Sequence, residues 1–258
     1  MSEVWSTRVD LSEMTYEEAR EVIARGAIAL LPTGATEAHG PHLPLSTDVV
    51  ISREAARRAH RLLLRDGVPA IVLPALAYAV TDYASEFSGT ISLPFDTAKA
   101  LVRDVILGAM RTGFRGVVIC NAHLEPENLR ALREGAEEAR ARGARVEFPD
   151  VTRKPHALRL GEEFKSGACH AGSYETSLVL AADPFLVRTE RAESLAPNPT
   201  SLSRAIRDGK KTFLEAGGAH AYFGDPSAGN AAEGELLYTE LSQIFATAAT
   251  TLGTGSRP

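Results

Sequence analysis

Residues 115–150 read RGVVICNAHLEPENLRALREGAEEARARGARVEFPD, and this stretch decides the fold class. A short apolar run at 116–120 is followed by a segment with helical apolar spacing at 126–143 and then by a second apolar run at 144–148. Gly143 ends the middle segment, as is common for helices. A strand, a helix and a strand in this order indicate parallel strands joined by a crossover helix.

The same alternation runs through the chain before residue 115. Thr15 and Glu18 have the spacing of a capping box and open the first expected helix. Expected strands lie at 27–32, 69–74, 116–120 and 144–148, and expected helices lie at 15–26, 52–67, 96–113 and 126–143. No Pro/Ser-rich linker or low-complexity segment divides the chain. We therefore predict a single α/β domain over residues 1–258 with a mostly parallel central sheet.

The composition excludes several classes of protein. A chain of 258 residues with 44% hydrophobic residues is long enough to bury a substantial core. The net charge of -5 leaves no basic field for nucleic acid or anionic lipid, and no segment reads as a signal peptide or membrane span. We therefore expect a cytoplasmic protein without nucleic-acid or membrane partners. Its two cysteines, Cys120 and Cys169, fit neither a disulfide framework nor a thiolate zinc motif, so any metal site must use nitrogen and oxygen ligands.

Three polar loops should meet at one edge of the predicted sheet. They span residues 34–48, 77–93 and 121–125 and leave the carboxyl ends of the first three strands, which is where ligands bind in open α/β sheets. The first loop reads GATEAHGPHLPLSTD and the third reads NAHLE, so both carry acidic and histidine side chains. We expect the chemistry of the protein to lie at this edge.

Five side chains in these loops are candidate metal ligands. Alternate residues of an extended segment point the same way, so Glu37 with His39, and His123 with Glu125, each offer one nitrogen and one oxygen ligand. With Asp48, these pairs suit two Zn or Mn ions that share one bridging carboxylate and activate a water for attack on an amide or ester. The alternative is that these loops are polar without binding metal, as loops commonly are.

Other segments supply further candidate site residues. His170 precedes an expected helix and is a candidate proton shuttle, with an N-cap or packing role as the alternative. Glu175 is either a ligand or a solvated carboxylate in the first turn of that helix. Cys169 either lines the pocket beside His170 or is a small buried residue. The candidate substrate-binding residues are Tyr78, Gly89, Ala122 and Glu175.

Five ordered motifs resemble those of the creatininase family (creatinine amidohydrolases). The stretch LLPTGATEAHGPHLPLSTD resembles the signature loop of the family, with its Glu-x-His-Gly-Pro-His-Leu-Pro followed by Asp. The other four are FSGTISL, NAHLEPEN, CHAGSYETSLVL and FGDPSAGNAAEGE. They are similar, in order, to the family's Phe-Pro-Gly-Thr segment, Asn-Gly-His segment, His-Ala-Gly helix and C-terminal Gly-Asp-Pro motif. The resemblance therefore extends along nearly the whole chain.

This resemblance implies a binuclear metal amidohydrolase on an αβα sandwich, often a hexamer, with two divalent ions (Zn or Mn) per subunit. Glu37 and His123 would serve one metal, His39 and Glu125 the other, and Asp48 would bridge them. Glu125 would also orient or deprotonate the bridging water. His170 would pass a proton to the leaving nitrogen. His42, between two prolines of the signature loop, would hold the loop in shape.

The chain departs from the family pattern around the expected pocket. Creatininases proper close the pocket with tryptophans near the His170 segment, whereas the only tryptophan here is Trp5. Many members also have a histidine where this chain has Ala84. Both departures predict an altered pocket and argue against stacking of creatinine.

Three functions follow as hypotheses. The first is metal-dependent hydrolysis of a non-peptide C–N bond in a small cyclic or linear amide, with a metal-bridging hydroxide. The second is a peptidase or deformylase of a cofactor-biosynthesis intermediate, of the mycofactocin or formamidopyrimidine type. The third is a noncatalytic binding protein with a degraded site, against which the presence of all five candidate ligands argues. The expected partners are a small-molecule amide and further copies of the same chain in a homo-oligomer.

Overall fold

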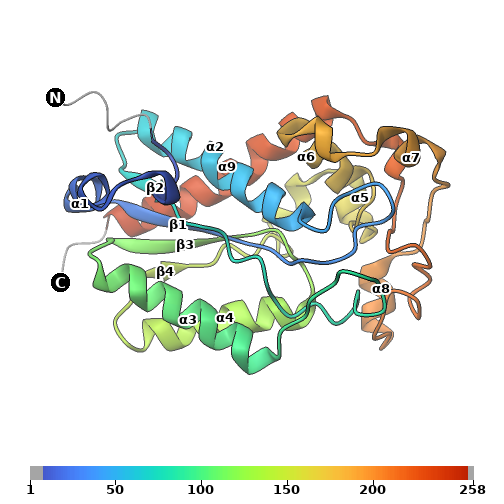
Figure 1. The fold of residues 1–258 in the computed structure, drawn as a ribbon, viewed down its shortest axis with the longest axis horizontal. Helices are drawn as coiled ribbons and strands as arrows, with labels where there is room; N and C mark the ends of the chain where they lie inside the picture. The colour runs from blue at the N-terminus through green and yellow to red at the C-terminus, as the bar shows by residue number, and fades with distance from the viewer. Residues whose placement is uncertain (1–7, 255–258) are drawn as a thin grey trace.

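A four-stranded parallel sheet forms the centre of the molecule, as the sequence predicts (Figure 1). The computed structural model describes residues 8–254, so Trp5 lies outside the described residues. The strands are arranged in the order β2-β1-β3-β4. Their bounds are Ile28–Thr33 for β1, Ala70–Val72 for β2, Gly116–Asn121 for β3 and Val146–Glu147 for β4.

The outer strands β2 and β4 are shorter than the sequence predicts. Prolines limit both, because a proline has no N–H to donate to a neighbouring strand. Pro69 precedes β2 and Pro74 follows shortly after it, whereas Pro149 follows β4. The central strands β1 and β3 pair over six residues, from Ile28 with Gly116 to Thr33 with Asn121.

Helices cover both faces of the sheet, which makes the fold an αβα sandwich. One face carries α2 (Thr47–Arg65), α6 (Ser173–Ala182) and α9 (Ala231–Thr254), and the other carries α3 (Phe95–Arg111) and α4 (Pro126–Arg140) (Figure 1). Alternate residues of β1 divide between the two cores: Ile28 and Leu30 pack on the first face, and Ala29 and Leu31 pack on the second. The predicted capping box of Thr15 and Glu18 opens α1 (Tyr16–Ala24).

Helix α2 begins at Thr47, whereas the sequence predicts a start at residue 52. The Thr47 hydroxyl donates to the Pro44 carbonyl at 2.7 Å, which ties the first turn to the preceding loop. Asp48 therefore lies in the first turn of α2, where the helix dipole favours a negative charge. The backbone of the helix consequently fixes the position of this carboxylate.

The chain between β4 and α9 forms short helices at one end of the molecule. This end is the one that the carboxyl ends of β1 and β3 face, and α1 lies at the opposite end (Figure 1). No helix within residues 8–254 is long and apolar enough to cross a membrane. The short helices are α5 (Gly161–Ser166), α7 (Thr189–Ser194), α8 (Leu202–Arg207) and the 3-10 turns η3 (His156–Arg159), η4 (Pro184–Leu186) and η5 (Pro226–Ala228); a further turn, η2 (Leu11–Glu13), precedes α1.

Candidate metal centre

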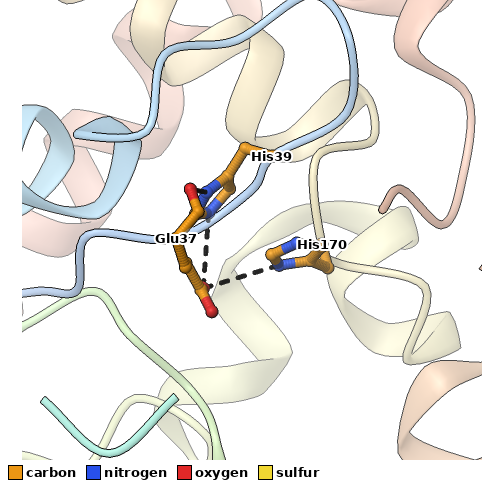
Figure 2. A group of neighbouring side chains, drawn as sticks. All are labelled: Glu37, His39 and His170. Carbon is orange, nitrogen blue, oxygen red and sulfur yellow. Dashed lines mark hydrogen bonds and ion pairs between the residues drawn. The ribbon is translucent and has the colours of Figure 1, made fainter. Parts of the chain in front are cut away.

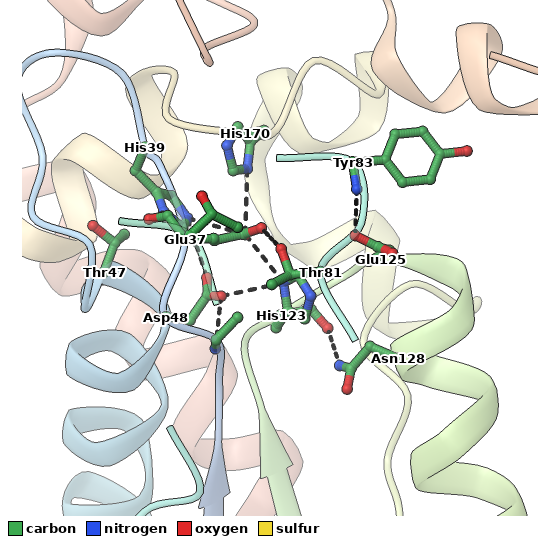
Figure 3. Close-up of polar contacts among 12 residues, drawn as sticks. Glu37, His39, Thr47, Asp48, Thr81, Tyr83, His123, Glu125, Asn128 and His170 are labelled. Carbon is green, nitrogen blue, oxygen red and sulfur yellow. Dashed lines mark hydrogen bonds and ion pairs between the residues drawn. The ribbon is translucent and has the colours of Figure 1, made fainter. Parts of the chain in front are cut away.

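Five buried acidic and histidine side chains meet at the carboxyl edge of the sheet, and Figure 3 labels Glu37, His39, Asp48 and His123 among them. The loop after β1 carries two of them, and the loop after β3 carries one. The first turn of α2 and the first turn of α6 each add a carboxylate. In this order the residues are Glu37, His39, His123, Asp48 and Glu175.

The Asp48 carboxylate lies between the two histidines. Its Oδ1 is 3.2 Å from Nε2 of His39, and its Oδ2 is 3.2 Å from Nδ1 of His123. Glu37 Oε1 is 3.1 Å from the same atom of His123, and Glu175 Oε2 is 3.5 Å from Nε2 of His39. Two groups of three potential ligands result, and they share Asp48: Glu37–Asp48–His123 and His39–Asp48–Glu175.

Both histidines present a ring nitrogen to the carboxylates in the way that a metal ligand does. Nδ1 of His39 is 3.2 Å from the Glu37 carbonyl, and Nε2 of His123 is 2.8 Å from the Val80 carbonyl. A carbonyl oxygen only accepts, so these nitrogens carry the protons of the neutral rings. The opposite nitrogens face carboxylate oxygens, and Nε2 of His39 has no hydrogen-bond partner among residues 8–254. A ring nitrogen that faces a carboxylate at this distance needs a positive charge between the two atoms, and either a proton or a bound metal ion can supply it.

The electrostatics of the cluster lead to the same conclusion. Burial alone lowers the pKa of His39, but the carboxylates of Glu175 and Asp48 outweigh it and raise this pKa to about 10. Burial raises the pKa of Glu175 to about 8. Burial also opposes the charge on Asp48, yet His39 and His123 hold its pKa well below the usual range. Without metal the histidines bind protons to balance the buried carboxylates, and divalent cations would replace those protons.

Glu125 lies outside the ligand groups found among the described residues. Its carboxylate accepts hydrogen bonds from the backbone N–H groups of Asp82 (3.0 Å) and Tyr83 (3.2 Å), and Figure 3 shows the second of these contacts. Glu125 lines the cavity described below. Burial raises the pKa of Glu125 to about 7. In the structure Glu175, and not Glu125, shares a group of potential ligands with His39.

His170 lies beside the ligand groups (Figure 2). Its Nε2 is 3.0 Å from the Ala38 carbonyl, and its Nδ1 is 4.0 Å from Oε1 of Glu37. With Glu37 and His39 it forms a third potential group of metal ligands. Burial and the neighbouring His39 lower its pKa to about 4, so the ring is neutral at pH 7 with Nδ1 free to accept a proton.

The backbone beside His170 also contributes to the site. Ala171 has a left-handed conformation (φ 51°), and its N–H donates to Oε2 of Glu175 at 2.6 Å. This bond orients the carboxylate of Glu175 towards His39. A non-glycine residue in this conformation is uncommon and occurs where the surrounding structure enforces it.

A cavity of about 570 Å³ opens onto the cluster. Of the four candidate substrate-binding residues, only Glu175 lines it among residues 8–254. The Ala122 N–H donates to the Thr33 carbonyl. Tyr78 is half-exposed and lines a separate small cavity beside α3, and Gly89 packs against the Leu45 side chain. Two further predicted residues are placed by the structure: Cys169 lines the cavity, and the buried His42 contacts the Thr176 hydroxyl at 3.0 Å.

Several residues that hold the candidate ligands in place were not predicted from the sequence. The buried Thr81 hydroxyl donates to Glu37, and Asn121 and Asn128 donate to the His123 carbonyl at 2.7 and 2.9 Å. Asn121 ends the apolar strand β3, so a polar residue at a strand end was an available signal. Thr81 lies in a long loop without periodicity, where nothing in the sequence distinguishes it.

Comparisons with known proteins point to one family. Residues 12–249 match the family model described as creatinine amidohydrolase. The mycofactocin precursor peptide peptidase of Mycobacterium tuberculosis (strain ATCC 25618 / H37Rv) is 32% identical over 219 residues, which cover 82% of this chain and 80% of that protein. The creatinine amidohydrolase of Pseudomonas putida is 29% identical over 215 residues, with coverage of 74% and 78%.

Solved structures resemble the fold over nearly its whole length. A crystal structure of creatinine amidohydrolase (creatininase) is 28% identical, with a TM-score of 0.77 and coverage of 97% of this chain and 100% of that one. A structure described as "Creatininase Mn" is 26% identical, with a TM-score of 0.75 and coverage of 95% and 98%.

Proposed function

The chain belongs to the creatininase family of hydrolases, and from this premise we propose that it hydrolyses an amide C–N bond with two divalent metal ions per subunit. The observation that carries the proposal is the pair of imidazole nitrogens, Nε2 of His39 and Nδ1 of His123, that face three buried carboxylates. This donor set of nitrogen and oxygen atoms suits zinc or manganese.

We assign the ligands from the distances within the cluster. Glu37, Asp48 and His123 would hold one ion, and His39, Asp48 and Glu175 would hold the other. Asp48 would serve both ions because each of its oxygens faces a different histidine. Ions bound there supply Lewis-acid activation of an amide carbonyl and of a water molecule.

The residues around the ligands would move the protons. Glu125 is fixed by two backbone N–H groups and has a pKa of about 7, which suits a group that takes a proton from water and releases it again near neutral pH. His170 is neutral with Nδ1 unbonded, so it can accept a proton and pass it to the leaving nitrogen. Glu37 is oriented by Thr81, which keeps this ligand directed at His123.

There are two candidate classes of substrate. The first is a small cyclic or linear amide. The second is a peptide or a formylated biosynthetic intermediate, and the cavity of about 570 Å³ favours it, because pockets of about 300–1,000 Å³ suit drug-sized molecules. The 32% identity to a precursor peptide peptidase supports the same reading. A homo-oligomer, with the hexamer as the expected form, and a cytoplasmic location stay predictions.

The test is to load the purified protein with Zn or Mn and to measure both bound metal and hydrolysis. We expect two ions per chain and metal-dependent hydrolysis of one of three substrate classes: creatinine, whose ring would open without release of an amine, or formamides or short peptides, which would release one. Glu37→Gln should lose metal and activity together, whereas Glu127→Gln, at an exposed carboxylate on α4, should lose neither. A protein that binds less than one ion per chain and hydrolyses no amide would overturn the proposal.

A further inference from the structure

The cavity is acidic at its buried end, here called the floor, and basic at its exposed opening, here called the mouth or rim. All four acidic residues that line it are buried at the floor, where the candidate metal ligands and Glu125 lie. Its walls are largely apolar and include Leu124, Phe164, Leu202, Ile206 and Phe213. The exposed residues that line the mouth include three cations, Lys154, Lys165 and Arg207.

The charge at the mouth is not balanced within the chain. Lys154 and Arg207 form no ion pair with residues 8–253. Lys165 contacts Glu162 at 2.7 Å, but the side chain of Glu162 is 91% exposed and lies outside the cavity lining. The whole chain carries a net charge of -5, so the local charge of the three cations at this opening is opposite in sign to the charge of the chain. Such a cluster attracts anions to the opening.

The three cations come from segments that are separate in the sequence. Lys154 precedes η3, Lys165 lies on α5, and Arg207 is the last residue of α8. Two hydrogen bonds join the segments of Lys165 and Arg207: the Ser201 hydroxyl donates to the Ser166 carbonyl at 2.8 Å, and the Ser203 N–H donates to the Gly167 carbonyl at 3.1 Å. The cations of α5 and α8 are therefore held on one rim.

We propose that the substrate is an amide with an apolar body and an anionic group, a carboxylate or a phosphate, at the end remote from the scissile bond. The inference rests on the proposed function, because it places the scissile bond at the buried floor. The apolar walls bind the body of such a molecule, and Lys154, Lys165 and Arg207 bind its anionic end. Creatinine and simple formamides lack both features.

Three matched probes test the inference by binding. They are N-acetyl-phenylalanyl-leucine, its C-terminal carboxamide, and the analogue in which a phosphonate replaces the carboxylate. Their dissociation constants are measured with the metal-loaded protein by calorimetry. We expect at least one anionic probe to bind about tenfold more tightly than the carboxamide, because two or three partly exposed charge pairs each contribute a few-fold. The anion that is preferred, carboxylate or phosphonate, identifies the source of the charge.

Variants of the rim locate the effect. The double variant Lys154→Ala/Arg207→Ala keeps only Lys165 of the three cations, so the preference should fall from about tenfold to a few-fold at most, with little change in the affinity for the carboxamide. Arg204→Ala is the matched control, because Arg204 lies on the same helix with its side chain 78% exposed and outside the cavity lining. Equal affinity for all three probes, an undiminished preference in the double variant, or no measurable binding of any probe would overturn the inference.

The two proposals can fail separately. Hydrolysis of amides without any preference for the anionic probes would remove the inference and leave the proposed function intact. A rim-dependent preference for anions in a protein that hydrolyses no amide would support the binding site and remove the proposed function.

Discussion

Replacement of Glu175 by glutamine should remove one of two metal ions. Oε2 of Glu175 lies 3.5 Å from Nε2 of His39, so one ion at the usual ligand distance of about 2.0–2.2 Å can contact both atoms. Glutamine keeps an oxygen that can accept the Ala171 N–H but loses the charge. At an effective dielectric constant of about 20, two unit charges about 4 Å apart attract by about 4 kcal/mol, and a closer divalent ion is attracted more strongly. The affinity for that ion should fall by about three orders of magnitude or more.

The assay is metal content per chain after gel filtration in metal-free buffer. We expect one ion in Glu175→Gln and two ions in the wild type. Glu125→Gln should keep two ions, because its carboxylate is bonded to the backbone of Asp82 and Tyr83, although its hydrolytic rate should fall. Glu127→Gln is the control for loss of a nearby charge, and thermal melting shows whether each variant is folded. Two ions in Glu175→Gln, or one in Glu125→Gln, would refute the assignment and favour Glu125 as the ligand.

Three further predictions concern the same site and the core. Asp48→Asn should lose both ions, because its two oxygens face different histidines at 3.2 Å; a metal count that stays at two per chain would contradict a shared carboxylate. Thr81→Val keeps the shape of the side chain but removes the hydroxyl that orients Glu37, so metal affinity should fall by about 10–100-fold in a competitive chelator titration, and an unchanged affinity would show that Thr81 does not orient this ligand. His60 is buried against the Ala70 carbonyl, and burial holds its pKa below the usual 6.5. The unfolded state therefore binds more protons below pH 6.5, so the free energy of unfolding should decrease there as the pH falls. Urea unfolding of His60→Gln should show a weaker decrease, and equal pH dependence would refute this cause.

The elements of the fold could be predicted because their signals are local. The apolar runs of β1 and β3 and the capping box at Thr15 lie within a few residues of the features that they specify. The start of α2 was missed because its first turn, from Thr47, lies within a loop-like sequence rich in proline and polar residues. The lengths of the outer strands were not predicted correctly because prolines limit them, and the pattern of apolar residues does not take proline into account.

The candidate site was accessible from the sequence only where topology brings residues together. Glu37, His39 and His123 leave parallel strands at one edge, and the structure gathers them in one cluster. Glu175 reaches the same cluster because α6 packs against α2 and α9, and no pattern in the sequence encodes that contact. The position of Glu125 depends on backbone donors in a different loop, which spacing within its own loop does not reveal.

Substitutions at the buried floor of the cavity and at its exposed rim have different costs in stability, so the two sets of residues are under different evolutionary constraints. At the floor each charged group depends on its neighbours, and removal of one partner from a buried charge pair commonly costs about 3–5 kcal/mol. At the rim Lys154, Lys165 and Arg207 are exposed, and substitutions at such positions usually change stability by less than about 0.5 kcal/mol. The rim residues can therefore change by mutation while the floor residues stay the same. A family built in this way can acquire new substrates and keep its chemistry, which accords with one scaffold whose relatives carry names as different as creatinine amidohydrolase and precursor peptide peptidase.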